Sequence, residues 1–157
     1  MLSRGPYTIY GFSMAEESNR TSFTDYWFYR TGDKAMWMEN GRLRMGGRIK
    51  EQINRAGEKI MPSEVEGYLC QHPNIKEAAV VGVPDEVLGN RICAYVMLEV
   101  EKQVDLREIH RFLKSIGVAF YKLPDQVESI DFWPLTSVGK IDKKVLVERA
   151  TKKEREI

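Results

Sequence analysis

The sequence has no apolar run that approaches the roughly 18 residues of a membrane-spanning helix, so no such helix is predicted. Its first residues, 1–6, also lack the apolar stretch of a signal peptide. An excess of one charge is missing as well, because 24 basic and 23 acidic residues leave a formal net charge of +1. These absences predict a cytoplasmic protein without an electrostatic patch for nucleic acid or an anionic membrane.

Cysteine and histidine are scarce. The two cysteines, Cys70 and Cys93, lie in apolar-patterned segments without metal-ligand spacing, so we interpret both as buried, reduced thiols. His72 lies at a predicted helix end and His110 lies within a helical pattern, and neither has a cysteine or carboxylate at metal spacing. No metal site is therefore predicted, and no Ser/His/Asp or Cys/His arrangement for nucleophilic catalysis stands out.

What remains is an ordinary globular composition. The chain of 157 residues, 43% of them hydrophobic, is long enough for one packed domain, or for one domain with a piece of another. Residues 1–49 have the pattern of short strands joined by turns, whereas residues 50–157 alternate helical and strand patterns. The sequence therefore predicts a boundary near residue 50.

The first part of the chain carries one strong turn signal. Asn40-Gly41 lies between two apolar segments and predicts a two-residue hairpin. The predicted strands are Tyr7–Tyr10, Phe28–Thr31, Met36–Met38 and Leu43–Met45, with a short helical turn at Ser13–Asn19.

The second part predicts a small α+β sandwich in which helices cover a three-stranded sheet. Its continuous apolar run, Ala78–Val83, favours a central strand closed by Pro84-Asp85. The predicted helices are Pro62–Cys70, a helix capped by Asp105 that ends near Gly117, and Lys143–Arg149, and the other predicted strands are Ile92–Leu98 and Gln126–Ile130.

Two segments place charged side chains beside glycine. Asp33 ends the segment Tyr29–Asp33, where a carboxylate at a tight turn can accept hydrogen bonds from the vicinal diol of a ribose. The alternative is that Gly32-Asp33 only turns the chain. Arg48 follows two glycines, which puts a guanidinium beside a closely approachable backbone, although such an arginine is often a plain surface residue.

A third segment, Thr136–Lys140, ends in a glycine followed by a lysine. Lys140 on such a loop can reach over a ligand and neutralise charge on a carboxylate and an α-phosphate. The segment is not a nucleoside-triphosphate P-loop, because the spacing of that motif is absent.

Taken in order, the blocks Tyr29–Asp33, Gly47–Ile60 and Pro134–Lys140 resemble the C-terminal third of adenylate-forming enzymes, the superfamily of acyl- and aryl-CoA synthetases, nonribosomal adenylation domains and luciferases. The likeness is closest to the 2,3-dihydroxybenzoate-AMP ligases, and Tyr121–Asp125 is also similar to a segment of that family. The resemblance implies that residues 50–157 form the mobile C-terminal domain, with a three-stranded sheet, covering helices and a β-hairpin. Residues 1–49 would be a few strands of the last β subdomain of the N-terminal domain.

The resemblance also implies roles for single residues. Asp33 and Arg48 would bind the nucleotide, and Lys140 would be the catalytic lysine that assists attack of a carboxylate on the α-phosphorus of ATP. Lys50 would be the hinge, whose backbone torsions change as the domain rotates. Gly57 and Lys59 would lie in the loop that faces the active site in the thioester-forming conformation.

This chain departs from the family pattern at Tyr10, Ala56 and Trp37. Ala56 replaces the first glycine of a usual Gly-Gly pair, which is a mild change unless the position needs a positive φ. Trp37 stands where many relatives have a basic residue, and the change either loosens contact with the nucleotide phosphates or is neutral.

The implied activity is that of a siderophore-pathway ligase. The parent enzyme would use ATP and Mg²⁺ to activate 2,3-dihydroxybenzoate or salicylate, then pass the acyl group to the phosphopantetheine thiol of an aryl carrier protein. The sequence lacks the Thr/Ser/Gly-rich phosphate loop ending in Pro-Lys and the aryl-acid pocket, which in the family belong to the N-terminal domain. We therefore expect the chain alone to be inactive and to bind no nucleotide tightly. The alternative is a non-catalytic module that docks a carrier protein or an N-terminal domain.

Overall fold

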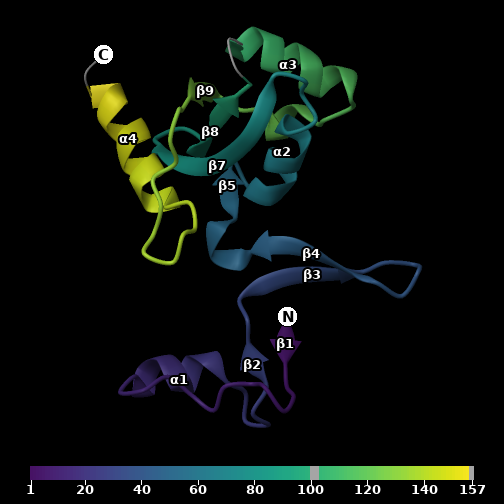
Figure 1. The fold of residues 1–157 in the computed structure, drawn as a ribbon, viewed down its shortest axis with the longest axis vertical. Helices are drawn as coiled ribbons and strands as arrows, with labels where there is room; N and C mark the ends of the chain where they lie inside the picture. Colours follow the sequence, from purple (N-terminus) through teal and green to yellow (C-terminus); the bar gives the residue numbers. More distant parts are fainter. Residues whose placement is uncertain (100–102, 156–157) are drawn as a thin grey trace. The chain divides into compact units, whose positions relative to one another are not determined.

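The computed structural model describes residues 1–99 and 103–155, and the chain divides into two compact units, Met1–Lys50 and Glu51–Ile157 (Figure 1). The first unit contains two small antiparallel sheets, β1–β2 and β3–β4. Its elements are β1 (Leu2–Ser3), α1 (Glu16–Ser22), β2 (Tyr29–Arg30), β3 (Asp33–Trp37) and β4 (Leu43–Arg48), followed by the 3₁₀ turn η1 (Ile49–Glu51).

The hairpin predicted around Asn40-Gly41 is confirmed as β3–β4, but its loop is longer than two residues. Trp37 pairs with Leu43, and the amide of Gly41 donates to the carbonyl of Met38 at 2.9 Å. The side chain of Asn40 accepts a hydrogen bond from the amide of Arg42 at 3.1 Å, which is the local bond that favours asparagine in turns.

The strand predicted at Tyr7–Tyr10 is wrong. Thr8 donates to the carbonyl of Gly5 at 3.0 Å in a turn, and the side chains of Tyr7 and Tyr10 are exposed. Strand formers need a pleated, half-buried surface to pack against, and no strand pairs with these four residues in the described part of the chain. The strand predicted at Phe28–Thr31 is confirmed as β2, and the short helix begins later than expected, at Glu16.

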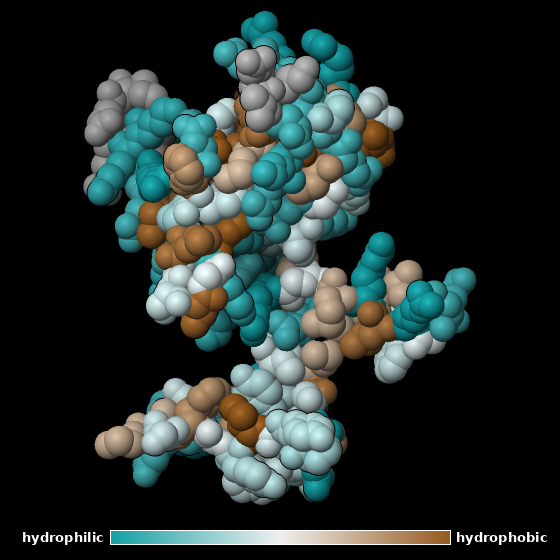
Figure 2. Space-filling model, viewed as in Figure 1, coloured by the Kyte–Doolittle hydropathy of each residue, from teal (hydrophilic) through white to brown (hydrophobic). Residues whose placement is uncertain are grey.

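Exposed apolar side chains lie along the β3–β4 hairpin (Figure 2). Trp37 is 75% exposed. Its neighbours on the hairpin with exposed apolar side chains are Met36, Met38, Leu43 and Met45. Apolar surface gathered in this way is typical of a face that another protein part covers.

The second unit is a small α+β domain built on a three-stranded sheet of order β7-β8-β9, in which β7–β8 is antiparallel and β8–β9 is parallel. Its elements are β5 (Ile53–Arg55), β6 (Glu58–Ile60), α2 (Pro62–Leu69), β7 (Ile75–Asp85), β8 (Gly89–Leu98), α3 (Leu106–Ser115), η2 (Phe120–Lys122), β9 (Gln126–Ser129) and α4 (Lys143–Arg155). The predicted fold class is therefore confirmed.

The run Ala78–Val83 is a strand, but the prediction that it is central is wrong, because β8 lies between β7 and β9. Its apolar continuity has another cause, namely that both faces of the sheet are covered (Figure 1). On one face Val80 packs in a cluster with residues of α2 and α3, and on the other face Val81 packs with Leu146 of α4. Alternate side chains of one strand thus reach two separate cores.

The helices follow their predicted signals. Asp105 caps α3 by accepting a hydrogen bond from the amide of Glu108 at 2.7 Å, and α3 ends two residues before Gly117. Helix α4 continues beyond the predicted end at Arg149. Cys93 is buried as predicted, whereas Cys70 is exposed because it follows the last residue of α2. Among the described helices, none is long and apolar enough to cross a membrane.

An ion pair joins α4 to the edge strand β9. The ammonium of Lys153 lies 2.6 Å from a carboxylate oxygen of Glu128, and the side chain of Gln126 donates to the same carboxylate at 2.7 Å. Burial raises the pKa of Glu128, but these hydrogen bonds outweigh burial and hold the pKa below its ordinary value of 4.5.

A carboxylate with a lowered pKa stabilises the fold above the pKa of the unfolded chain and loses this effect as the pH falls through the folded pKa. Between pH 7 and pH 3, urea unfolding should therefore show a larger fall in the free energy of unfolding for the wild type than for Glu128→Gln. Equal falls in the two proteins would contradict this expectation.

Candidate functional site

The first candidate cluster joins Asp33 and Arg48. Asp33 begins β3 and Arg48 ends β4, and the hairpin register places the two residues opposite one another. The Nε of Arg48 lies 3.0 Å from Oδ1 of Asp33, and its Nη1 donates to the carbonyl of Thr31 at 2.8 Å. A carboxylate and a guanidinium side by side offer acceptors for a diol and donors for a phosphate.

The backbone around Thr31 fixes this pair. Gly32 has a φ of +73°, a conformation that favours glycine, and its carbonyl accepts a hydrogen bond from the amide of Ile49 at 2.9 Å. The amide of Asp33 donates to the hydroxyl of Thr31 at 3.1 Å. The Asp33 side chain remains 21% exposed and that of Arg48 54% exposed, so both can still meet a ligand.

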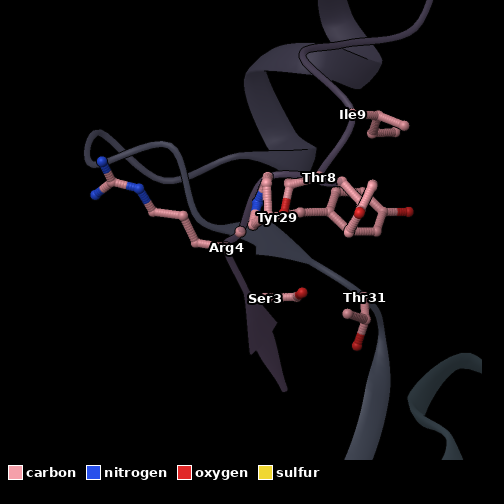
Figure 3. Close-up of a pocket in the computed structure, with 9 residues that line it drawn as sticks. Ser3, Arg4, Thr8, Ile9, Tyr29 and Thr31 are labelled. Atoms are coloured by element: carbon pink, nitrogen blue, oxygen red, sulfur yellow. The ribbon is translucent and has the colours of Figure 1, made fainter.

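An open pocket of about 500 Å³ lies beside the strands β1 and β2 (Figure 3). Ser3, Thr8, Tyr29 and Thr31 are among the residues that line it. The guanidinium of Arg4 lies over the ring of Phe28, 5.6 Å from its centroid. Apart from Arg4, the side chains of the lining are hydroxyl or apolar groups, and the lining contains no carboxylate that would serve in catalysis.

Lys50 lies in the 3₁₀ turn η1, is exposed, and is the last residue of the first unit. The residues on either side are held within their own units. Ile49 bonds to Gly32 in the first unit, whereas Glu51 lies 3.2 Å from the ammonium of Lys143 in the second. A backbone change at Lys50 would therefore disturb neither of these contacts.

Gly57 and Lys59 belong to the hairpin β5–β6. Ile53 pairs with Ile60, both side chains are buried, and Lys59 is exposed on β6. The turn between the strands contains Ala56 at φ +50° and Gly57 at φ +90°. Two successive positive φ angles are typical of the type I′ turn, which matches the twist of a two-residue hairpin.

The positive φ at Ala56 means that the methyl group departing from the family pattern is strained. Ala56→Gly should raise the free energy of unfolding by about 0.5–1 kcal/mol, after the greater freedom of glycine in the unfolded chain is taken into account. Urea unfolding of the two proteins measures the difference. Gly67→Ala is a reference for glycine-alanine exchange inside a helix, and a loss of stability in Ala56→Gly would contradict the expectation.

Lys140 ends a closed loop that Thr136 holds together. The amide of Thr136 donates to the carbonyl of Lys140 at 2.7 Å, and the Thr136 hydroxyl accepts from the Lys140 amide at 3.2 Å. The carbonyl of Thr136 also accepts from the amide of Gly139, which has a φ of +76°. Leu135 bridges to Ile141 just outside the loop. The Lys140 side chain is exposed on this turn.

The structure thus brings together Asp33 with Arg48, and Gly57 with Lys59, whereas Lys140 lies on a separate loop of the second unit. The sequence did not predict the Asp33–Arg48 ion pair, nor the loop that Thr136 closes through hydrogen bonds to Gly139 and Lys140. A threonine three residues before a Gly-Lys pair is the signal that points to such a loop. Within residues 1–99 and 103–155, no group of three or more His, Cys, Asp or Glu side chains could hold a metal ion.

Comparison with known proteins agrees with these motifs. Residues 64–140 match the family described as AMP-binding enzyme C-terminal domain. The chain is 46% identical over 149 residues to the vibriobactin-specific 2,3-dihydroxybenzoate-AMP ligase of Vibrio cholerae, covering 95% of this chain and 27% of that protein. It is 45% identical over 153 residues to the 2,3-dihydroxybenzoate-AMP ligase of Bacillus subtilis, covering 98% of this chain and 28% of that protein.

A solved structure supports the same likeness. ATP-bound MatB from Rhodopseudomonas palustris superposes with a TM-score of 0.84 at 29% identity, over 93% of this chain and 29% of that one. The chain therefore spans little more than a quarter of the length of the curated relatives that it matches.

Proposed function

Because the chain belongs to the adenylate-forming enzymes and carries their AMP-binding C-terminal domain, we propose that it is the C-terminal part of an aryl-acid AMP ligase of siderophore biosynthesis. The substrate class is 2,3-dihydroxybenzoate or salicylate. The observation that carries the proposal is the 46% identity to a 2,3-dihydroxybenzoate-AMP ligase over 95% of the chain.

In the first half-reaction, a carboxylate oxygen of the aryl acid attacks the α-phosphorus of ATP, and the bond to pyrophosphate breaks. Asp33 would accept hydrogen bonds from the ribose hydroxyls, and Arg48, which lies 3.0 Å from its carboxylate, would hold that carboxylate in place and donate to the phosphate. Lys140 would neutralise charge that develops on the transferring group, which is the main task of a protein in such a transfer. The described residues offer no carboxylate cluster for Mg²⁺, so we assign no step to the metal.

In the second half-reaction, the thiol of a phosphopantetheine arm loses its proton and attacks the acyl carbon, and AMP leaves. Gly57 would let the narrow arm pass close to the backbone, with Lys59 beside it on the hairpin. Lys50 would be the hinge between the two conformations, which is supported by the anchoring of Ile49 and Glu51 within separate units.

Residues 1–49 would complete the last β subdomain of an N-terminal domain, and residues 50–157 would be the mobile domain. The exposed apolar side chains of the β3–β4 hairpin support an N-terminal domain as the first partner, because that domain would cover them. The second partner would be an aryl carrier protein.

The test is a chimera in which this chain replaces the matching 153-residue segment of the Bacillus subtilis relative. We expect this chimera to catalyse ATP–pyrophosphate exchange that depends on 2,3-dihydroxybenzoate, and to load an aryl carrier protein. Exchange no higher than that of the same relative lacking the segment would overturn the proposal.

The rival function, a docking module without catalysis, is tested with the purified chain by itself. The purified 157-residue chain should show no exchange, and addition of the remaining part of the relative should restore exchange that Lys140→Ala abolishes. Binding to that part or to the carrier protein without restored exchange would instead support the docking function.

A further inference from the structure

The segment Tyr121–Asp125 resembles a segment of the family but has no role in the chemistry above. The carboxylate of its last residue, Asp125, accepts three hydrogen bonds from two other parts of the second unit. Its carboxylate accepts hydrogen bonds from Nη2 of Arg55 at 2.6 Å, from Nε of Arg55 at 3.1 Å and from the amide of Ile92 at 2.7 Å. The two nitrogens of Arg55 therefore bind it in the bidentate geometry that fixes an arginine side chain most firmly.

This ion pair is sheltered from water. The Arg55 side chain is 16% exposed and that of Asp125 25% exposed. The hydrogen bonds to Asp125 also raise the pKa of Arg55 above its ordinary value, so the guanidinium stays charged. Such a pair is screened far less than an exposed one.

Arg55 is the last residue of β5 and directly precedes the Ala56-Gly57 turn. Asp125 directly precedes β9, and Ile92 lies in the central strand β8. The Asp125 carboxylate thus ties the start of the turn to the middle of the sheet.

The other contacts of this turn come from a different place. The amide of Ala56 donates to the carbonyl of Leu88 at 2.7 Å, and the side chain of Asn90 donates to the carbonyl of Asn54 at 3.2 Å. Leu88 and Asn90 lie at the β7–β8 turn. Without Asp125, the β5–β6 pairing and these contacts with the β7–β8 turn would still hold the hairpin, but Arg55 would lose its bidentate partner beside the strained Ala56.

We infer that Asp125 is a positioning residue that acts through Arg55 to hold the Ala56-Gly57 turn in the conformation needed for acyl transfer to the thiol. The inference rests on the proposed function, since it concerns the second half-reaction of that ligase. It assigns the transfer step, and not adenylation, to the bidentate pairing of one carboxylate with one guanidinium.

The first test uses the 157-residue chain and amide hydrogen exchange. Asp125→Asn keeps the size of the side chain and an acceptor for Ile92, but it weakens the bidentate pair. Relative to the amide of Val80 in β7, protection of the Ala56 amide should fall at least about 10-fold. Lys122→Met is the matched control, because Lys122 is in the same segment but pairs with Glu64 of α2 at 2.6 Å.

The second test measures both half-reactions in the chimera. Asp125→Asn and Arg55→Lys should each lower carrier-protein loading at least 10-fold, while pyrophosphate exchange stays within about twofold of the parent chimera. The double variant should lose no more than either single variant, because both changes break one interaction. Lys122→Met should leave the ratio of the two rates unchanged.

Three results would overturn the inference: unchanged protection at Ala56, unchanged loading in an active chimera, or additive losses in the double variant. A parent chimera without exchange would overturn the proposed function instead, and protection at Ala56 would still decide whether Asp125 positions the turn. Loss of exchange and loading together in Asp125→Asn, but not in Lys122→Met, would also count against a role confined to transfer.

Discussion

Lys140→Ala should lower ATP–pyrophosphate exchange by the chimera about 10²–10³-fold, the loss that follows removal of one well-placed charged or hydrogen-bonding group from a transition state. The closed loop around Thr136 allows the effect of the ammonium to be separated from any effect on the loop. Because two backbone hydrogen bonds and one hydroxyl hold the loop without the Lys140 side chain, alanine should remove the ammonium and leave the loop intact.

The control for this variant is Lys144→Ala, which removes an exposed lysine from the first turn of α4. It should change exchange less than about twofold, as surface substitutions usually do. Lys140→Arg keeps the charge on a bulkier group, so its pyrophosphate exchange should lie between that of Lys140→Ala and that of Lys144→Ala. Exchange that survives Lys140→Ala within threefold would remove Lys140 from the adenylation step.

The second large effect is expected for Gly57→Leu, which should lower carrier-protein loading about 100-fold while pyrophosphate exchange changes little. No other part of the described chain lies within 4 Å of a Cβ placed on Gly57, so the leucine should fit without a clash. The side chain would project from the turn into the path proposed for the phosphopantetheine arm.

A leucine at φ +90° also strains the backbone, by about 1–2 kcal/mol, and this effect needs its own control. Gly117→Leu supplies it, because Gly117 has a φ of +81° and equally open surroundings at the end of α3. Both variants should lose similar stability, and only Gly57→Leu should lose loading. Equal loading by the two variants would contradict the assignment of Gly57.

Local signals in the sequence predicted much of the fold. The Asn40-Gly41 turn and the Asp105 cap are formed by bonds within a few residues, so their patterns are sufficient. The position of Ala78–Val83 in the sheet was predicted wrongly, because an apolar run reports burial on both faces and not strand order. Tyr7–Tyr10 has the composition of a strand, but pairing depends on a partner that the local pattern cannot reveal.

In the candidate site, too, local motifs can be predicted from the sequence and tertiary contacts cannot. Asp33, Arg48 and Lys140 stand out by their place in motifs, whereas their contacts depend on tertiary structure. Arg55 and Asp125 are 70 residues apart in sequence, and nothing near either residue indicates that they pair. The sequence alone leaves open whether Ala56 is a mild change, and its positive φ shows that the residue is strained.

The two-sided sheet has a practical meaning for anyone who wishes to excise the domain. The family match ends at Lys140, but Leu146 and Ala150, which are buried against one face of the sheet, come after it. Ile53 and Ile60, which are buried in the cluster on the other face, come before the match begins at residue 64. A piece trimmed to residues 64–140 would leave apolar surface bare on both sides and should aggregate, whereas a cut just before Glu51 would retain both layers of packing.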